Sequence, residues 1–165
     1  MDESQRQRTL ELISAPPSKE SLLQLISWLD TECFSAPLVS LPRQILARAV
    51  IAIGYRLIDK LGLPTIKATT EAAEIFALEP TLESFDAYLR AATNSYPFGS
   101  GDGCYAIHEI GFAGCEPGSG CSSGSGCLYS SGLEDVFVMQ CIADELIPWL
   151  EDRADPVANR WNAHG

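Results

Sequence analysis

Four cysteines between residues 96 and 132 are the residues of this chain best suited to chemistry. Each follows a glycine, and three of them end a Gly-Asp/Ser-Gly-Cys unit. A glycine before a cysteine lets the backbone turn sharply, so that amide N–H groups can point at a bound sulfur. This composition is compatible with a metal-binding protein, with zinc or an iron–sulfur cluster as cofactor, which is the alternative to the first hypothesis given below. The candidate ligands are Cys104, Cys115, Cys121 and Cys127, with His108 as a substitute.

The spacing of these cysteines is unlike a standard metal framework. Intervals of eleven, six and six residues separate them, whereas the strong zinc and iron–sulfur patterns contain closely paired cysteines. The alternative interpretation is that they are small buried side chains of an ordered coil, because cysteine is among the residues most often buried. Elemental analysis of anaerobically purified protein separates the two interpretations.

The charges around these cysteines disfavour an enzyme. Nine acidic residues and no lysine or arginine occur between Ala91 and Asp152. Carboxylates near a thiol raise its pKa, so these cysteines should be poor nucleophiles unless a cation lies beside them. A nucleophilic pair of Cys104 and His108 is therefore disfavoured, and a non-catalytic role is the better expectation.

The whole chain is acidic, and this bears on its partners. Its 165 residues include 22 acidic and 11 basic ones, which give a formal net charge of -11. Nucleic acids and anionic membranes attract clustered lysine and arginine, so both are disfavoured as partners. A basic protein partner is favoured, and its association should weaken with salt. The first hypothesis is thus an acidic binding or regulatory protein, as immunity proteins, inhibitors and adaptors are, with a contact through Asp102, Glu109 and Glu116.

The N-terminal residues favour a cytoplasmic location. Residues 1–8 are polar, and the apolar cluster that follows is too short for a secretory signal. The longest apolar stretch, residues 47–53, contains Arg48 and stops at Gly54, so no membrane span is expected. In a reducing compartment the cysteines should be thiols or metal ligands rather than disulfides.

The elements that must hold this segment are predicted to be helices. Apolar residues recur at helical spacing in residues 4–15, 18–33, 42–61, 65–78, 81–94 and 133–151. Residues 155–165 look like a frayed tail that Trp161 would anchor, and a short strand near residues 105–112 is an open alternative. The sequence predicts a single all-α domain over residues 1–165. Its expected architecture is an antiparallel helical bundle of five or six helices with one long ordered Gly/Ser/Cys-rich loop, residues 96–132.

Single residues add local detail to this expectation. Ser18 and Thr81 are expected to be N-caps. The 42–61 helix has the broadest apolar face and should be central and most buried, and Gly54 within it should mark close packing against a neighbour. Pro148 predicts a kink or an early helix end.

The remaining thiols and the C-terminal acids have simple expected roles. Cys33 and Cys141 lie next to apolar positions of predicted helices and should be buried thiols. Four acids of the predicted C-terminal helix are expected to form a solvated face that stabilises little. They are Asp144, Glu145, Glu151 and Asp152.

Overall fold

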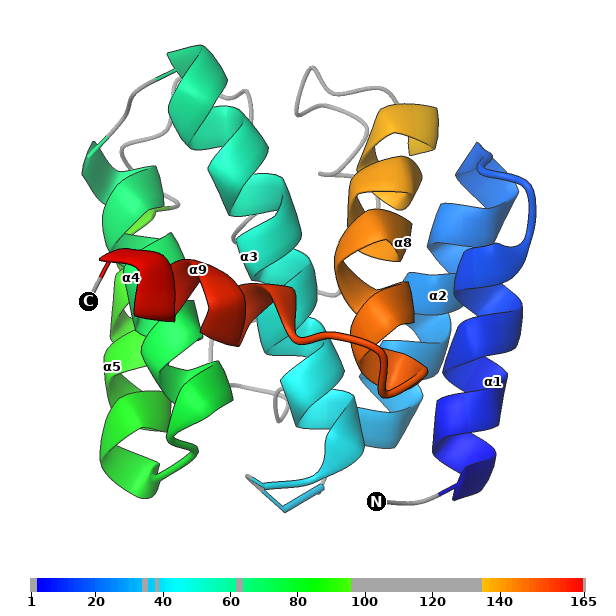
Figure 1. Ribbon diagram of the computed structural model, residues 1–165, viewed down its shortest axis with the longest axis horizontal. Helices are drawn as coiled ribbons and strands as arrows, with labels where there is room; N and C mark the ends of the chain where they lie inside the picture. Colours follow the sequence, from blue (N-terminus) through cyan, green and yellow to red (C-terminus); the bar gives the residue numbers. More distant parts are fainter. Residues whose placement is uncertain (1–2, 34–35, 38, 62–63, 96–134, 165) are drawn as a thin grey trace.

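Helices make up all the regular secondary structure in the part of the chain that the structure describes (Figure 1). The structure is a computed structural model and describes residues 3–33, 36–37, 39–61, 64–95 and 135–164. The helices are α1 (Glu3–Ser14), α2 (Lys19–Cys33), α3 (Leu41–Leu61), α4 (Pro64–Leu78), α5 (Leu82–Ser95), α8 (Asp135–Leu150) and α9 (Pro156–His164). The all-α prediction is confirmed for these ranges, and the six predicted helices agree with the structure within two residues at each end. The predicted loop over residues 96–132 and the alternative strand near residues 105–112 lie outside the described residues.

Helix α9 corrects the prediction for the C-terminal residues. A frayed tail is expected over residues 155–165, but Pro156–His164 are helical, so the described ranges hold seven helices instead of five or six. Asp155 is the N-cap, because its Oδ1 accepts a hydrogen bond of 3.1 Å from the N–H of Ala158. Pro156 takes the first helical position, where a missing N–H has no cost. The Asp155-Pro156 pair is the signal in the sequence for this helix start.

The turn between α8 and α9 explains how α9 reaches the rest of the molecule. Pro148 predicts an early end, and α8 does end two residues later, at Leu150. The Pro148 carbonyl accepts hydrogen bonds from the N–H groups of Arg153 and Ala154, at 2.9 and 3.2 Å. Asp152 has a φ of 57°, a left-handed conformation that often closes a helix. The chain therefore turns sharply, and α9 runs crosswise to α8 and lies against α4 and α8 (Figure 1).

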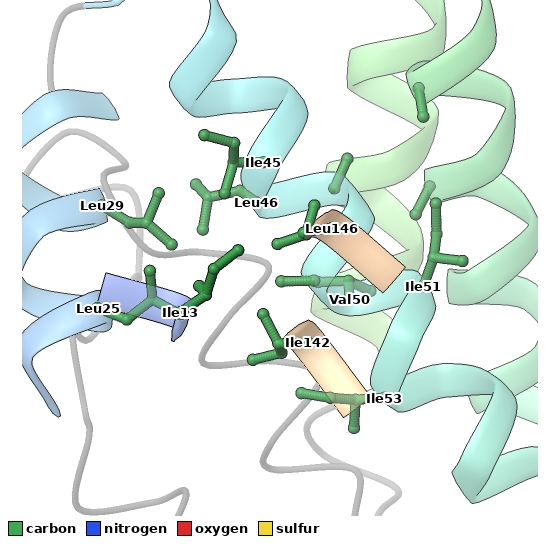
Figure 2. Packing of buried hydrophobic residues seen from close by; sticks show 14 of the residues in the cluster. Ile13, Leu25, Leu29, Ile45, Leu46, Val50, Ile51, Ile53, Ile142 and Leu146 are labelled. Carbon is green, nitrogen blue, oxygen red and sulfur yellow. The ribbon is translucent and has the colours of Figure 1, made fainter. Parts of the chain in front are cut away.

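Helix α3 lies in the middle of the apolar interior. It packs against α1, α2, α4 and α8, and all residues from Gln44 to Gly54 are buried. Figure 2 shows side chains from several helices that meet around it, among them Leu29, Val50 and Leu146. The prediction that residues 42–61 form the central buried helix is confirmed.

Within the described ranges, no helix is long and apolar enough to cross a membrane.

Gly54 lets α3 and α4 approach each other closely. A Cβ atom placed on Gly54 would lie 2.1 Å from Oγ1 of Thr70 and 3.1 Å from its Cβ. The first distance is far below any ordinary contact, so a side chain at this position would force the two helices apart. The predicted close packing at Gly54 is confirmed.

Two helices begin with the same reciprocal pair of hydrogen bonds. The N–H of Ser21 donates to Oγ of Ser18 at 3.0 Å, and the N–H of Ser18 donates to Oγ of Ser21 at 2.8 Å. Thr81 and Ser84 repeat the arrangement, with both distances at 3.0 Å. Each pair satisfies two N–H groups that a helix start would otherwise leave open. Both predicted N-caps, Ser18 and Thr81, are confirmed.

Candidate binding groove between helices α4 and α9

The residues predicted to bind a metal or a partner lie outside the described part of the chain. These are Asp102, Cys104, His108, Glu109, Cys115, Glu116, Cys121 and Cys127. The metal site and the acidic contact surface therefore stay predictions. Among the residues that the structure does describe, no group of three or more His, Cys, Asp or Glu side chains could hold a metal ion.

Cys141 is a buried free thiol, as predicted. Its burial raises the pKa of the Cys141 thiol, and Asp144 raises it further, whereas Arg56 opposes the shift. The thiol is therefore a poor nucleophile and acts as a small apolar side chain in α8. Cys33 ends α2, and its side chain lies outside the described part of the structure.

A groove runs between α4 and α9. It consists of two adjoining pockets of about 490 Å³ and about 460 Å³, which share Ile75 of α4 and Trp161 of α9. Both volumes are within the usual range of ligand sites. The first pocket is also lined by Tyr55, Lys67, Glu71, Glu74 and Arg160, and the second by Leu78, Glu79 and Asn162.

Helix α4 forms one wall of the groove because of a four-residue spacing. Lys67, Glu71, Ile75 and Glu79 follow one another at this interval and therefore lie along one face of the helix. All four are exposed, whereas Phe76, toward the interior, is fully buried. The wall is thus a charged stripe with one apolar side chain in it.

The start of α9, the other wall, is held by a buried arginine. Arg48 of α3 donates to both carboxylate oxygens of Asp155, at 2.8 and 3.3 Å. Its guanidinium also lies 4.0 Å from the ring centre of Trp149. Such paired hydrogen bonds fix both position and orientation. Val157, the second residue of the helix, is fully buried beside this pair.

A second arginine holds the middle of α9. Arg160 donates to both carboxylate oxygens of Glu145 on α8, and its guanidinium lies 4.3 Å from the ring centre of Tyr55. The Glu145 side chain is only 11% exposed, so the prediction of a solvated face is wrong for this residue. The other three acids of that set, Asp144, Glu151 and Asp152, are exposed as expected.

Glu74 is the most buried acidic residue that lines the groove, at 4% exposure. The Tyr55 hydroxyl donates to its Oε2 at 2.8 Å, and Oε1 accepts no hydrogen bond from the described residues. Burial raises the pKa of Glu74, and Glu71 and Glu145 add to this, whereas Tyr55 and Arg160 oppose it. Burial and the neighbouring Glu74 also raise the pKa of Tyr55 to about 12, so its phenol stays a donor.

The groove combines negative charge with apolar surface. Three carboxylates line it against two cations, and one of these cations, Arg160, is already paired with Glu145. Ile75 and Trp161 are each 42% exposed between these charges. Large apolar side chains exposed in a hollow are typical of a binding surface. The arrangement suits a ligand that joins positive charge to an apolar stem.

Two sequence features could have indicated this groove. Ile75 is an apolar residue in a stripe that is otherwise charged. Glu74 is a charged residue close to Ala73 and Phe76, on the side of α4 whose other residues are buried. Neither feature alone separates a binding groove from ordinary surface variation.

Comparisons with protein-family models, curated protein sequences and solved structures give no significant match for this chain. A function can therefore be argued only from the groove, its charges and the composition of the chain.

Proposed function

We propose that this chain is a non-catalytic binding or regulatory protein that binds a basic segment of a partner protein. The α4–α9 groove carries the proposal, because exposed apolar side chains lie there among carboxylates. The net charge of -11 acts in the same direction by attracting a basic partner from a distance. The helical bundle is the scaffold in this proposal. Residues 96–132 supply a second acidic contact through Asp102, Glu109 and Glu116.

Apolar and charged residues of the groove have different roles in this proposal. Ile75 and Trp161 provide affinity, since full burial of an exposed large apolar side chain contributes about 1.5–3 kcal/mol and 42% of each is left for a partner to cover. Glu71 and Glu79 are exposed, and an exposed ion pair contributes only about 0.2–1 kcal/mol. Their role is to accelerate association and to orient the partner. Added salt should therefore slow association more than it speeds dissociation.

A labelled peptide of alternating leucine and lysine tests the proposal by fluorescence anisotropy at low and high salt. A Glu71→Lys/Glu79→Lys variant reverses the charge of the groove. A Glu11→Lys/Glu20→Lys variant changes the net charge equally, on exposed positions of α1 and α2. We expect the groove variant to weaken binding about tenfold or more and the matched variant to weaken it less than about threefold.

Two outcomes would contradict the proposal. Equal weakening by both variants would mean that net charge alone attracts the peptide. Binding of a matched leucine–glutamate peptide would mean that charge has no role. A third variant, with Asp102, Glu109 and Glu116 changed to lysine, tests the second contact; unchanged binding would remove residues 96–132 from the proposal and leave the groove.

A further inference from the structure

We infer that the first pocket of the groove receives one lysine side chain of the partner, with Glu74 as its counter-ion. The inference rests on the proposed function and names the side chain that the groove selects. The pocket of about 490 Å³ is lined by residues of α3, α4 and α9, and Glu74 is the buried carboxylate among them. Figure 1 shows α9 across α4 at this place.

The hydrogen bonding of Glu74 favours an ammonium over a guanidinium. The Tyr55 hydroxyl occupies Oε2, which leaves Oε1 without a donor among the described residues. A guanidinium binds a carboxylate best through two parallel hydrogen bonds, one to each oxygen. An ammonium is a compact charge that needs only one oxygen. The single open oxygen therefore suits lysine.

The charges around Glu74 also favour the binding of a cation. Glu71 and Glu145 lie near it, and Arg160, the nearest cation, makes both of its paired hydrogen bonds to Glu145. A carboxylate buried in this way loses hydration that a partner charge can replace. An anionic ligand would fit poorly, since the second cation that lines the pocket, Lys67, is exposed and therefore screened by solvent.

The apolar lining suits the stem of a lysine. Ile75 and Trp161 line the same pocket as Glu74 and are partly exposed. The methylene groups of lysine can pack against such side chains while the ammonium reaches a polar group. The indole of Trp161 adds attraction for a cation that passes over its face.

Small analogues of side chains test this inference directly. The probes are n-butylammonium for lysine, N-propylguanidinium for arginine and 1-butanol as the neutral control, each titrated against the full chain. The indole N–H signal of Trp161 is followed by NMR and assigned with a Trp161→Phe variant. We expect saturable shifts with n-butylammonium, none with 1-butanol, and binding at least about threefold weaker with N-propylguanidinium.

Substitutions at the pocket locate the effect. Glu74→Gln removes the charge and keeps an oxygen for the Tyr55 hydroxyl, and it should weaken n-butylammonium binding about tenfold or more. Glu79→Gln, in the second pocket, should weaken it less than about twofold. Tyr55→Phe frees Oε2 and should reduce the preference for n-butylammonium over N-propylguanidinium.

Acid should weaken the binding through Glu74. Burial raises its pKa, Glu71 and Glu145 raise it further, and Tyr55 and Arg160 lower it. A bound cation favours the ionised carboxylate, so the affinity for n-butylammonium should fall as the pH drops through the raised pKa. The Glu74→Gln variant should lack this part of the pH dependence. It should also fold normally, because a raised pKa means that burial of the charge opposes folding at neutral pH.

The possible results separate this inference from the proposed function. Unchanged n-butylammonium binding in Glu74→Gln, or no saturable shift in the native chain, overturns the lysine pocket. Equal or tighter binding of N-propylguanidinium or 1-butanol overturns it as well. The proposed function depends instead on the leucine–lysine peptide and on charge reversal at Glu71 and Glu79. The leucine–lysine peptide can therefore fail to bind while n-butylammonium still binds through Glu74. It can also bind when n-butylammonium does not.

Discussion

The interior around α3 and the attachment of α9 are held together by different forces. The interior is built from apolar side chains of α1, α2, α3, α4, α5 and α8 that exclude water, several of which Figure 2 shows. Helix α9 adds the fully buried Val157 to it and is otherwise held by ion pairs of Arg48 and Arg160. Apolar burial depends little on pH or salt, whereas ion pairs depend on both. Within the described ranges, the α9 wall of the groove should therefore respond more to pH and salt than the apolar interior does.

The largest effect is expected from a cavity in the interior. Leu146 of α8 is fully buried, so Leu146→Ala should lower the free energy of unfolding by about 2–5 kcal/mol. Urea denaturation measures the change. Leu82→Ala is the matched control, since Leu82 is 67% exposed and should change stability by less than about 0.5 kcal/mol. Similar losses in both variants would contradict the role assigned to the interior.

A smaller loss is expected where α3 and α4 meet. Gly54→Ala should lower the free energy of unfolding by about 1–3 kcal/mol, because the new methyl group collides with the side chain of Thr70. Thermal or urea denaturation measures the change. A Gly54→Ala/Thr70→Ala double variant should recover part of the loss, because the colliding hydroxyl is gone. If the two changes were simply additive, the collision would not be the cause.

A local effect is expected when the arginine at the start of α9 is removed. Arg48→Met keeps the apolar stem and removes the hydrogen bonds to Asp155, whose side chain is 33% exposed, and should cost about 1–2 kcal/mol. Amide hydrogen exchange should accelerate in α9 more than in α3. Arg153→Met removes an exposed ion pair with Glu151 and serves as control, with little change expected. Uniform acceleration in all helices would contradict a local role.

The smallest effect is expected from acid, below the ordinary pKa of an aspartate, on the same ion pair. Burial opposes the ionisation of Asp155, but hydrogen bonds from Arg48 and from the N–H groups of Ala158 and Val157 hold its pKa below the ordinary value. Its contribution is therefore complete above the unfolded pKa of about 3.9 and is lost as the pH falls through the lower folded value. Carbon chemical shifts of α9 should report a loss of helix in that window. Asp155→Asn should remove this transition; its persistence would assign it to another group.

Local features of this fold could be predicted from the sequence because they depend on residues close together in the chain. The capping residues Ser18 and Thr81 act on N–H groups within one turn, and the apolar face of α3 follows from helical spacing. Gly54 was informative because a glycine inside a helix is costly unless a neighbour needs the space. The burial of Cys141 followed from its place beside apolar positions of α8.

The groove could not be predicted, because the charges that build it are distant in the sequence. The absence of bases between Ala91 and Asp152 suggested carboxylates without partners, yet Arg160 pairs with Glu145 from the next helix. Tyr55 and Glu74 lie 19 positions apart. A pattern along the chain shows which residues are charged, and only packing decides which of them meet.

Helix α9 shows most clearly the difference between what the sequence determines and what only the tertiary structure decides. By itself the sequence determined that the chain is helical in its described ranges, where the long helices begin and end, and which faces are apolar, since these follow from propensity and periodicity. A helix of nine residues has little stability alone. Whether residues 156–164 fray or fold depended on Arg48, 107 positions before Asp155, and on Glu145 of α8. The tertiary structure alone decided this, because it creates the contacts that offset the entropy of ordering the chain.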